Sequence, residues 1–180
     1  MSILTGFLPF LVFAVLNGRI GPAVALAAGA AVAAILIVRN RRRGHDLNIL
    51  ETGTFALFAA VAILLGATGG RISIFAVRLI VDAGLLAIVL ISIAMRKPFT
   101  LQYARREVPR PFWNHPRFIR ANYVITSAWA VVFLVMVIIE AAIVFVPGVP
   151  SDLGVIVVIA ALAGGVLFTR WYANVSRRRS

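Results

Sequence analysis

Residues 96–121, RKPFTLQYARREVPRPFWNHPRFIRA, decide the fold of this chain. They carry seven of its 18 basic residues and lie between two long apolar segments. A basic segment flanked in this way predicts a loop on one surface of a membrane. The sign of its charge then fixes the side on which every other loop must lie.

The composition of the whole chain agrees with a membrane location. Of its 180 residues 62% are hydrophobic and only 13% are charged, and the mean hydropathy is +1.00. This is far more apolar than a soluble domain of the same length needs to be. The net charge of +12 falls in short basic runs between apolar segments, so we expect anionic lipid headgroups as the partner and no nucleic acid.

Enzymatic chemistry has little support in the sequence. There is no cysteine, and the two histidines, His45 and His115, lie far apart in polar segments. No nucleophile with its base, glycine-rich phosphate loop or metal-ligand spacing is present. We therefore expect a non-enzymatic protein with no catalytic residues, no metal and no cofactor.

Six apolar segments predict an all-α, polytopic membrane protein built as a bundle of six transmembrane helices. A bilayer core about 30 Å thick needs about 20 helical residues. The runs are continuously apolar, whereas barrel strands alternate, so helices are favoured. The first segment is short and contains Pro9, so it extends, tilts or spans incompletely; it lacks the basic start of a secretory signal, and we expect it to be uncleaved. The expected spans are residues 3–18, 20–38, 50–66, 72–95, 122–146 and 153–171.

The distribution of basic residues predicts the orientation. If the amino terminus is cytoplasmic, three inward segments carry the basic residues: four lie between 39 and 43, seven in the cytoplasmic loop 96–121, and four from Arg170 onward. Three of the last four belong to a basic tail at 172–180. The outward segments carry only Arg19 and Arg71. Because Lys and Arg accumulate on the cytoplasmic side of bacterial membrane proteins, we expect both termini in the cytoplasm.

Small residues recur at four-residue spacing in the second expected span, at Ala25, Gly29 and Ala33, and again near residues 160–165 in the sixth. Such spacing lets helix backbones approach closely. We expect packing within the chain, with contacts in a homo-oligomer as the alternative.

Three charged residues fall well inside expected spans, away from the span ends. Arg78 and Asp82 stand four residues apart, hence on one helix face, and Glu140 has a depth close to that of Arg78. Intramembrane charges usually face the protein interior and are partnered. We expect a structural ionic tie, with a substrate or proton site of a small transporter or channel as the alternative.

Polar residues also mark the inner ends of two spans: Glu51, Thr54, Asn122 and Thr126. Glu51 begins the third span, where a carboxylate suits the positive end of the helix dipole, so capping is its expected role. The others, with Thr52, form a candidate inner vestibule. Threonines in membrane helices usually bond back to their own helix, which is the competing interpretation.

In the central loop, prolines prevent one continuous helix, so we expect a short helical turn at residues 101–106 followed by an irregular cover. Aromatic side chains interleave with arginines, a composition typical of a segment in the headgroup region. Docking of a cytoplasmic partner or gating is the alternative. The expected anchoring residues are Arg96, Lys97, Arg105, Arg106, Trp113, Arg117 and Arg120.

Several short motifs resemble the bacterial intracellular septation protein A family, also called inner-membrane-spanning protein. They are FLPFLVF at residues 7–13, Glu51 with Thr54, the Lys97-Pro98 pair, Trp113, and AWAVVF at residues 128–133. The resemblance implies a multi-pass inner-membrane protein linked to cell division and envelope integrity, with partners in that machinery and no established enzymatic activity. Two departures bear on shared function: the loop between Pro111 and Tyr123 is longer than expected, and Glu140 stands where a neutral polar residue is expected.

Overall fold

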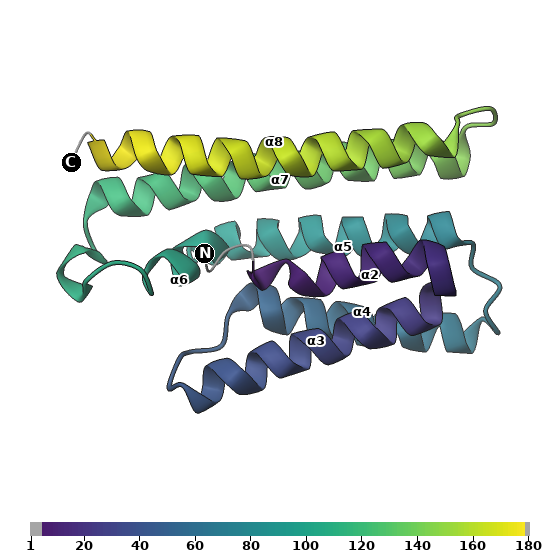
Figure 1. Ribbon diagram of the computed structural model, residues 1–180, viewed down its shortest axis with the longest axis horizontal. Coiled ribbons are helices and arrows are strands. Elements are labelled where there is room, and N and C mark those ends of the chain that lie inside the picture. The colour runs from purple at the N-terminus through teal and green to yellow at the C-terminus, as the bar shows by residue number, and fades with distance from the viewer. Residues whose placement is uncertain (1–4, 179–180) are drawn as a thin grey trace. The chain divides into compact units, whose positions relative to one another are not determined.

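The computed structural model describes the backbone of residues 5–178 and the side chains of residues 5–176, and this part of the chain contains helices and turns but no strand (Figure 1). It divides into two compact units, residues 1–88 and 89–180, which are described in turn. The elements are α2 (Leu8–Ile20), α3 (Pro22–Arg42), α4 (Ile49–Ala67), α5 (Ile74–Ala94), α6 (Phe99–Ala104), the 3₁₀ turn η1 (Arg110–Phe112), α7 (Pro116–Phe145) and α8 (Ser151–Arg178).

In the first unit, α3 packs against both α2 and α4. Phe58 of α4 lies at the centre, fully buried, with its ring 5.1 Å from that of Phe10 and 5.5 Å from that of Phe13. A Cβ placed on Gly29 of α3 would come within 2.3 Å of Phe58. The absence of a side chain at Gly29 therefore lets α3 reach the aromatic cluster, as expected for small residues that pack within the chain.

The part of α5 that belongs to the first unit packs against α4 through two further glycines. A Cβ on Gly84 of α5 would lie 2.3 Å from Leu57, and one on Gly53 of α4 would lie 3.0 Å from Ile88. Each glycine accepts a branched aliphatic side chain from the facing helix. Close helix contact in this unit thus depends on small residues on α3, α4 and α5.

The second unit is built on the antiparallel pair α7 and α8, with α6 packed on α7 (Figure 1). Gly165 of α8 receives the side chains of Val132 and Trp129, whose atoms would lie 3.1 Å and 3.4 Å from an added Cβ. Trp129 is almost fully buried. The bulky residues of α7 and the small residues of α8 are therefore complementary.

Three helices extend four or more residues beyond the ends expected from hydropathy. α3 continues to Arg42, so Arg39 lies in the helix and not in the connector. α7 begins at Pro116, six residues before the expected span, because proline is well suited to a first helical turn. α8 continues to Arg178, beyond the expected end at residue 171. The helical turn expected at residues 101–106 is present as α6, two residues earlier.

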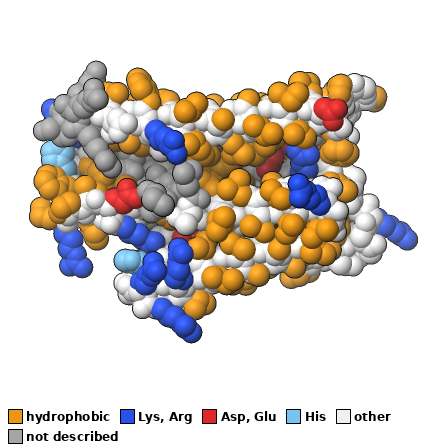
Figure 2. Space-filling view, in the orientation of Figure 1, with side chains coloured by type: hydrophobic (Ala, Val, Ile, Leu, Met, Phe, Trp, Pro, Cys, Tyr) orange, Lys and Arg blue, Asp and Glu red, His pale blue; other side chains and the backbone are white. Residues whose placement is uncertain are grey.

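Among the residues that the structure describes, five helices are long and apolar enough to cross a membrane: α3, α4, α5, α7 and residues 151–176 of α8. The thirteen residues of α2 span only about 20 Å, less than the bilayer core of about 30 Å. Large apolar side chains lie on the outside of the helices, such as Ile63 with 72% of its surface exposed and Ile156 with 64%. On the face shown in Figure 2, hydrophobic side chains cover much of the helices. These features identify a helical membrane protein.

Candidate functional site

The carboxylate of Glu51 is a buried polar group of the first unit that accepts hydrogen bonds from two asparagine side chains. Asn40 of α3 donates its side-chain amide to both oxygens of Glu51, over 2.9 Å and 2.7 Å. Asn48, which precedes the first residue of α4, donates to Oε1 over 2.7 Å. All three side chains are buried. Glu51 also lies in the first turn of α4, where the positive end of the helix dipole favours a carboxylate.

Glu51 therefore does more than the expected capping, because it joins two helices. The tie depends on α3 remaining helical through Asn40. Gly44 follows the end of α3 at φ 71°, and the backbone N–H of His45 bonds back to the carbonyl of Asn40 over 3.0 Å. This is the terminating arrangement in which a left-handed residue satisfies the last carbonyls of a helix.

The threonines of α4 bond to their own helix. The hydroxyl of Thr54 donates to the carbonyl of Leu50 over 2.6 Å, and that of Thr52 to the carbonyl of Asn48 over 2.9 Å. Thr54 is fully buried and Thr52 is partly buried. This is the competing interpretation given above, and the geometry offers little support for Thr52 and Thr54 as vestibule residues.

In the second unit, Asn122 and Thr126 of α7 are joined to α6 by Thr100. The hydroxyl of Thr100 donates to the carbonyl of Asn122 over 2.9 Å and lies 2.8 Å from the hydroxyl of Thr126. The side-chain amide of Asn122 bonds to the carbonyl of Phe118 over 2.9 Å. These buried groups fix the short helix α6 on the start of α7.

A third polar contact joins α7 to α8. The indole N–H of Trp129 donates to the hydroxyl of Thr169 over 3.0 Å, and this hydroxyl donates to the carbonyl of Gly165 over 2.8 Å. The sequence analysis did not single out Asn40, Thr100 or Thr169. A signal was present, because each is a polar residue within or beside an apolar run, but its partner is set by helix packing.

The charged residues expected inside spans lie in different units. Arg78 and Asp82 are on α5 in the first unit, one turn apart, with Asp82 buried and Arg78 half-buried. Glu140 is on α7 in the second unit and is fully buried. A shared three-residue cluster stays a prediction.

Within its own unit, Glu140 lies beside the first turn of α8. A Cβ added to Gly154 would lie 3.8 Å from Oε1 of Glu140, so the carboxylate faces the amino-terminal end of α8. That end carries the positive pole of the helix dipole and backbone N–H groups without partners in the helix.

The basic loop has an ordered centre at Trp113. The guanidinium carbons of Arg105 and Arg110 lie 5.5 Å and 5.9 Å from the centroid of its ring, and Arg106 lies 5.7 Å from that of Tyr103. The indole N–H of Trp113 donates to the carbonyl of Val108 over 3.0 Å. Cation–π contacts of this kind hold the loop in a compact shape.

The remaining expected anchoring residues, Arg96, Lys97, Arg117 and Arg120, are all exposed. Arg96, two residues after the end of α5, has a left-handed backbone conformation, at φ 56°. The backbone N–H of Lys97 then bonds to the carbonyl of Ser92 in α5 over 2.9 Å. Arg117 and Arg120 lie in the first turns of α7. Their exposure is compatible with contact to headgroups.

The described residues contain no group of three or more histidine, aspartate or glutamate side chains that could hold a metal ion. Comparison with known proteins found no matching family model, no matching curated protein and no matching solved structure.

Proposed function

We propose that this chain is a non-enzymatic, multi-pass protein of the bacterial inner membrane that supports envelope maintenance and cell division through contacts with other membrane proteins. The resemblance to the septation protein A family supplies the cellular process. The observation that carries the scaffold role is the use of buried polar side chains. Glu51, Thr100 and Trp129 each bond to a neighbouring helix or to the residues beside it. Polar groups engaged in this way stabilise a fixed arrangement of helices.

The proposed topology has six spans with both termini in the cytoplasm. The basic run at the end of α3 and the basic loop before α7 support this orientation, because they follow α3 and α5, which would run in the same direction across the membrane. α2 would be the short first span, accommodated by tilt or by local thinning of the bilayer. The inner-leaflet headgroups would then meet the exposed arginines of both segments.

Deletion and complementation test the function. In the source bacterium, deletion of the gene should lengthen cells or misplace septa, and the natural protein should restore normal division. A double variant, Asp82→Asn with Glu140→Gln, should also restore division if it inserts at the same level, because a scaffold does not need these charges for transport. Normal cell length and envelope integrity in the deletion strain would contradict the proposal.

A small proton- or cation-coupled transporter is the second candidate, favoured by one observation. Asp82 is 8% exposed and Glu140 is fully buried, each inside a long apolar helix. Intramembrane carboxylates commonly mark ion pathways. Flux into proteoliposomes should then be abolished by Asp82→Asn or Glu140→Gln but retained in Asp152→Asn, which changes an exposed carboxylate at the start of α8. Absence of flux in the natural protein would leave the scaffold role.

A further inference from the structure

The last turns of α3 have two different faces. Leu36 and Asn40 point into the first unit and are buried, and Asn40 is fixed there by Glu51. Ile35, Val38 and Arg39 lie on the opposite side and are exposed. Because Asn40 cannot turn outward without losing its bonds to Glu51, the orientation of the outward face is set by the same contact.

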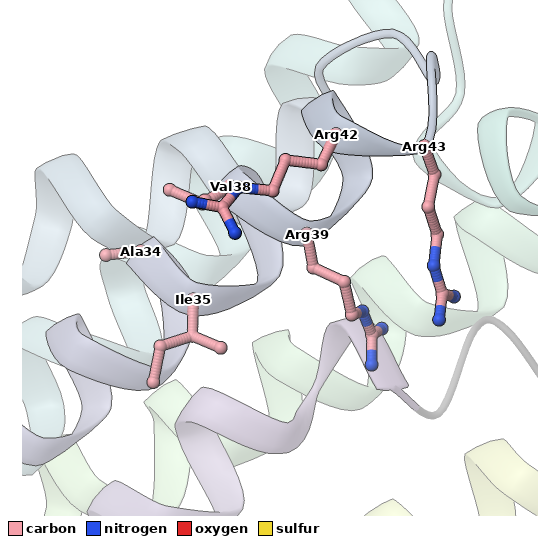
Figure 3. Close-up of a pocket in the computed structure, with 6 residues that line it drawn as sticks. All are labelled: Ala34, Ile35, Val38, Arg39, Arg42 and Arg43. Atoms are coloured by element: carbon pink, nitrogen blue, oxygen red, sulfur yellow. The ribbon is translucent and has the colours of Figure 1, made fainter.

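A groove of about 580 Å³ lies along this outward face. Its lining residues come from the last part of α3 and from the residue that follows this helix: Ala34, Ile35, Val38, Arg39, Arg42 and Arg43. Figure 3 shows Arg39 and Arg43 extending to the same side of the helix, with Arg42 folded along it toward Val38. The groove therefore has apolar residues along one part, the guanidinium groups of Arg39 and Arg43 on one side, and that of Arg42 beside Val38.

The spacing of these residues places the groove parallel to the axis of α3. Positions 35, 38, 39 and 42 follow the i, i+3, i+4, i+7 pattern of one helix face. The apolar residues come first along the chain, and Arg39 and Arg42 follow in the last turn of α3. Arg43 comes directly after the helix. An occupant must place a chain beside Ile35 and Val38 and an anionic group beside the arginines.

The favourable effect of basic residues at a helix carboxyl end explains the presence of arginines but not this arrangement. Arg41 is in the same last turn and is also exposed, yet it does not line the groove. The groove thus selects three of the four arginines at this end of α3. That selection provides a matched control for any experiment on the site.

From this geometry we infer that the groove binds an anionic phospholipid, with its phosphate on Arg39, Arg42 and Arg43 and an acyl chain along Ala34, Ile35 and Val38. Guanidinium groups bind phosphate oxygens through paired, charge-assisted hydrogen bonds. Basic pockets beside membrane helices are suited to anionic headgroups. This is a defined site on α3, beyond the general anchoring of the central loop, and it does not depend on the scaffold role or on any partner protein.

Binding of phosphatidylglycerol to the purified full-length protein in neutral detergent tests the inference. Native mass spectrometry can compare the natural protein with Arg39→Gln, Arg42→Gln, Arg43→Gln and the control Arg41→Gln. Each groove substitution should weaken binding about fivefold, as expected when one arginine contact to an anionic lipid is lost. Arg41→Gln should leave the affinity within experimental error of the natural protein.

A second substitution examines the apolar end. Ile35→Asn should weaken binding of phosphatidylglycerol without changing the charge of the protein. Ile63→Asn is its control, since Ile63 is similarly exposed on α4 and lies outside the groove. Equal loss in both variants would contradict a role for Ile35 in holding the acyl chain.

Binding of other ligands shows whether the site recognises a lipid headgroup or any free phosphate. Phosphatidylcholine should bind more weakly than phosphatidylglycerol, and inorganic phosphate should not displace the lipid at millimolar concentration. Displacement by inorganic phosphate would show an anion site without lipid specificity and would overturn the inference. Equal weakening by Arg41→Gln would also overturn it, because net charge alone would then account for binding. These readouts are obtained in detergent and do not change if the proposed role in division fails.

Discussion

The side-chain amide of Asn40 lies 2.9 Å and 2.7 Å from the two carboxylate oxygens of Glu51, and so joins α3 to α4 inside the first unit. The two residues are eleven positions apart in the chain and both are buried. A buried carboxylate that loses a donor retains the cost of its desolvation. The stability of the first unit should therefore be sensitive to substitution of either residue.

Replacement of Asn40 by leucine should lower the free energy of unfolding by about 2 kcal/mol, the usual cost of losing a hydrogen bond to a charged group. Unfolding in mixed micelles with increasing sodium dodecyl sulfate measures this change. Asn174→Leu is the control, because Asn174 is exposed on α8. A loss of the same size in both variants would show that the Asn40–Glu51 contact contributes nothing specific.

Replacement of Gly29 by alanine should destabilise the first unit by about 1–3 kcal/mol, the usual cost of overpacking. The new Cβ would meet Phe58, which is held between Phe10 and Phe13 and has little room to move. Gly18→Ala is the matched control, since nothing lies within 4 Å of an added Cβ there. That variant should be as stable as the natural protein or more so, because alanine favours a helix. Retained stability in Gly29→Ala would contradict the close approach of α3 to Phe58.

Thr169→Val should destabilise the pair of α7 and α8 by about 1 kcal/mol, because the indole of Trp129 loses its acceptor. A double-mutant cycle with Trp129→Phe isolates the coupling between the two residues. Thr68→Val serves as control, because Thr68 directly follows α4 and its hydroxyl bonds to the carbonyls of Leu64 and Leu65 in the last turn of that helix. A coupling energy of zero would mean that the contact between Trp129 and Thr169 is not maintained.

Trp113→Ala should increase tryptic cleavage after Arg105 and Arg106 about tenfold, because the two cation–π contacts that hold Arg105 and Arg110 on the indole, of about 0.5–1 kcal/mol each, are lost. Limited proteolysis of the purified protein, followed by mass spectrometry, gives the cleavage rates at both sites. Phe112→Ala is the neighbouring control, since Phe112 is exposed. Equal rates in the natural protein and Trp113→Ala would show that Trp113 does not order the loop.

Single cysteines test the proposed topology, since the chain has none of its own. An impermeant maleimide applied to intact spheroplasts should label Ser73→Cys and Ser151→Cys. Ser73 directly precedes α5, and Ser151 is the first residue of α8. The maleimide should label His45→Cys and Asn174→Cys only after the membrane is permeabilised. All four positions are exposed, so access through the membrane decides the labelling. Labelling of His45→Cys in intact spheroplasts would contradict a cytoplasmic connector between α3 and α4.

Hydropathy and charge predicted the helical class and the positions of five long helices, because apolar runs are continuous and basic residues mark their ends. They placed α4 and α5 within two residues of the observed bounds. They failed where a helix continues past its apolar part, as α3 does through Arg42 and α7 does from Pro116. In these turns the helix is maintained by backbone bonds and by packing, neither of which changes the local hydropathy.

The polar contacts between helices were harder to predict for a different reason. Asn40 appeared as one residue of a basic connector, and its bond to Glu51 exists only because α3 and α4 turn particular faces toward each other. Thr100 and Thr169 are comparable, since their partners lie on other helices. The threonines that bond within α4 could be predicted, because their partners lie one turn away in the same sequence.

Within each unit the closely packed helices follow one another along the chain: α3 packs on α2 and then α4 on α3, and likewise α7 follows α6 and α8 follows α7. A ribosome delivers segments in this same order, so each helix emerges when its predecessor is already available. Pairing between consecutive segments requires only short loop closure, which is rapid. Assembly of each unit can therefore proceed stepwise during synthesis, and an early segment need not wait for a distant partner.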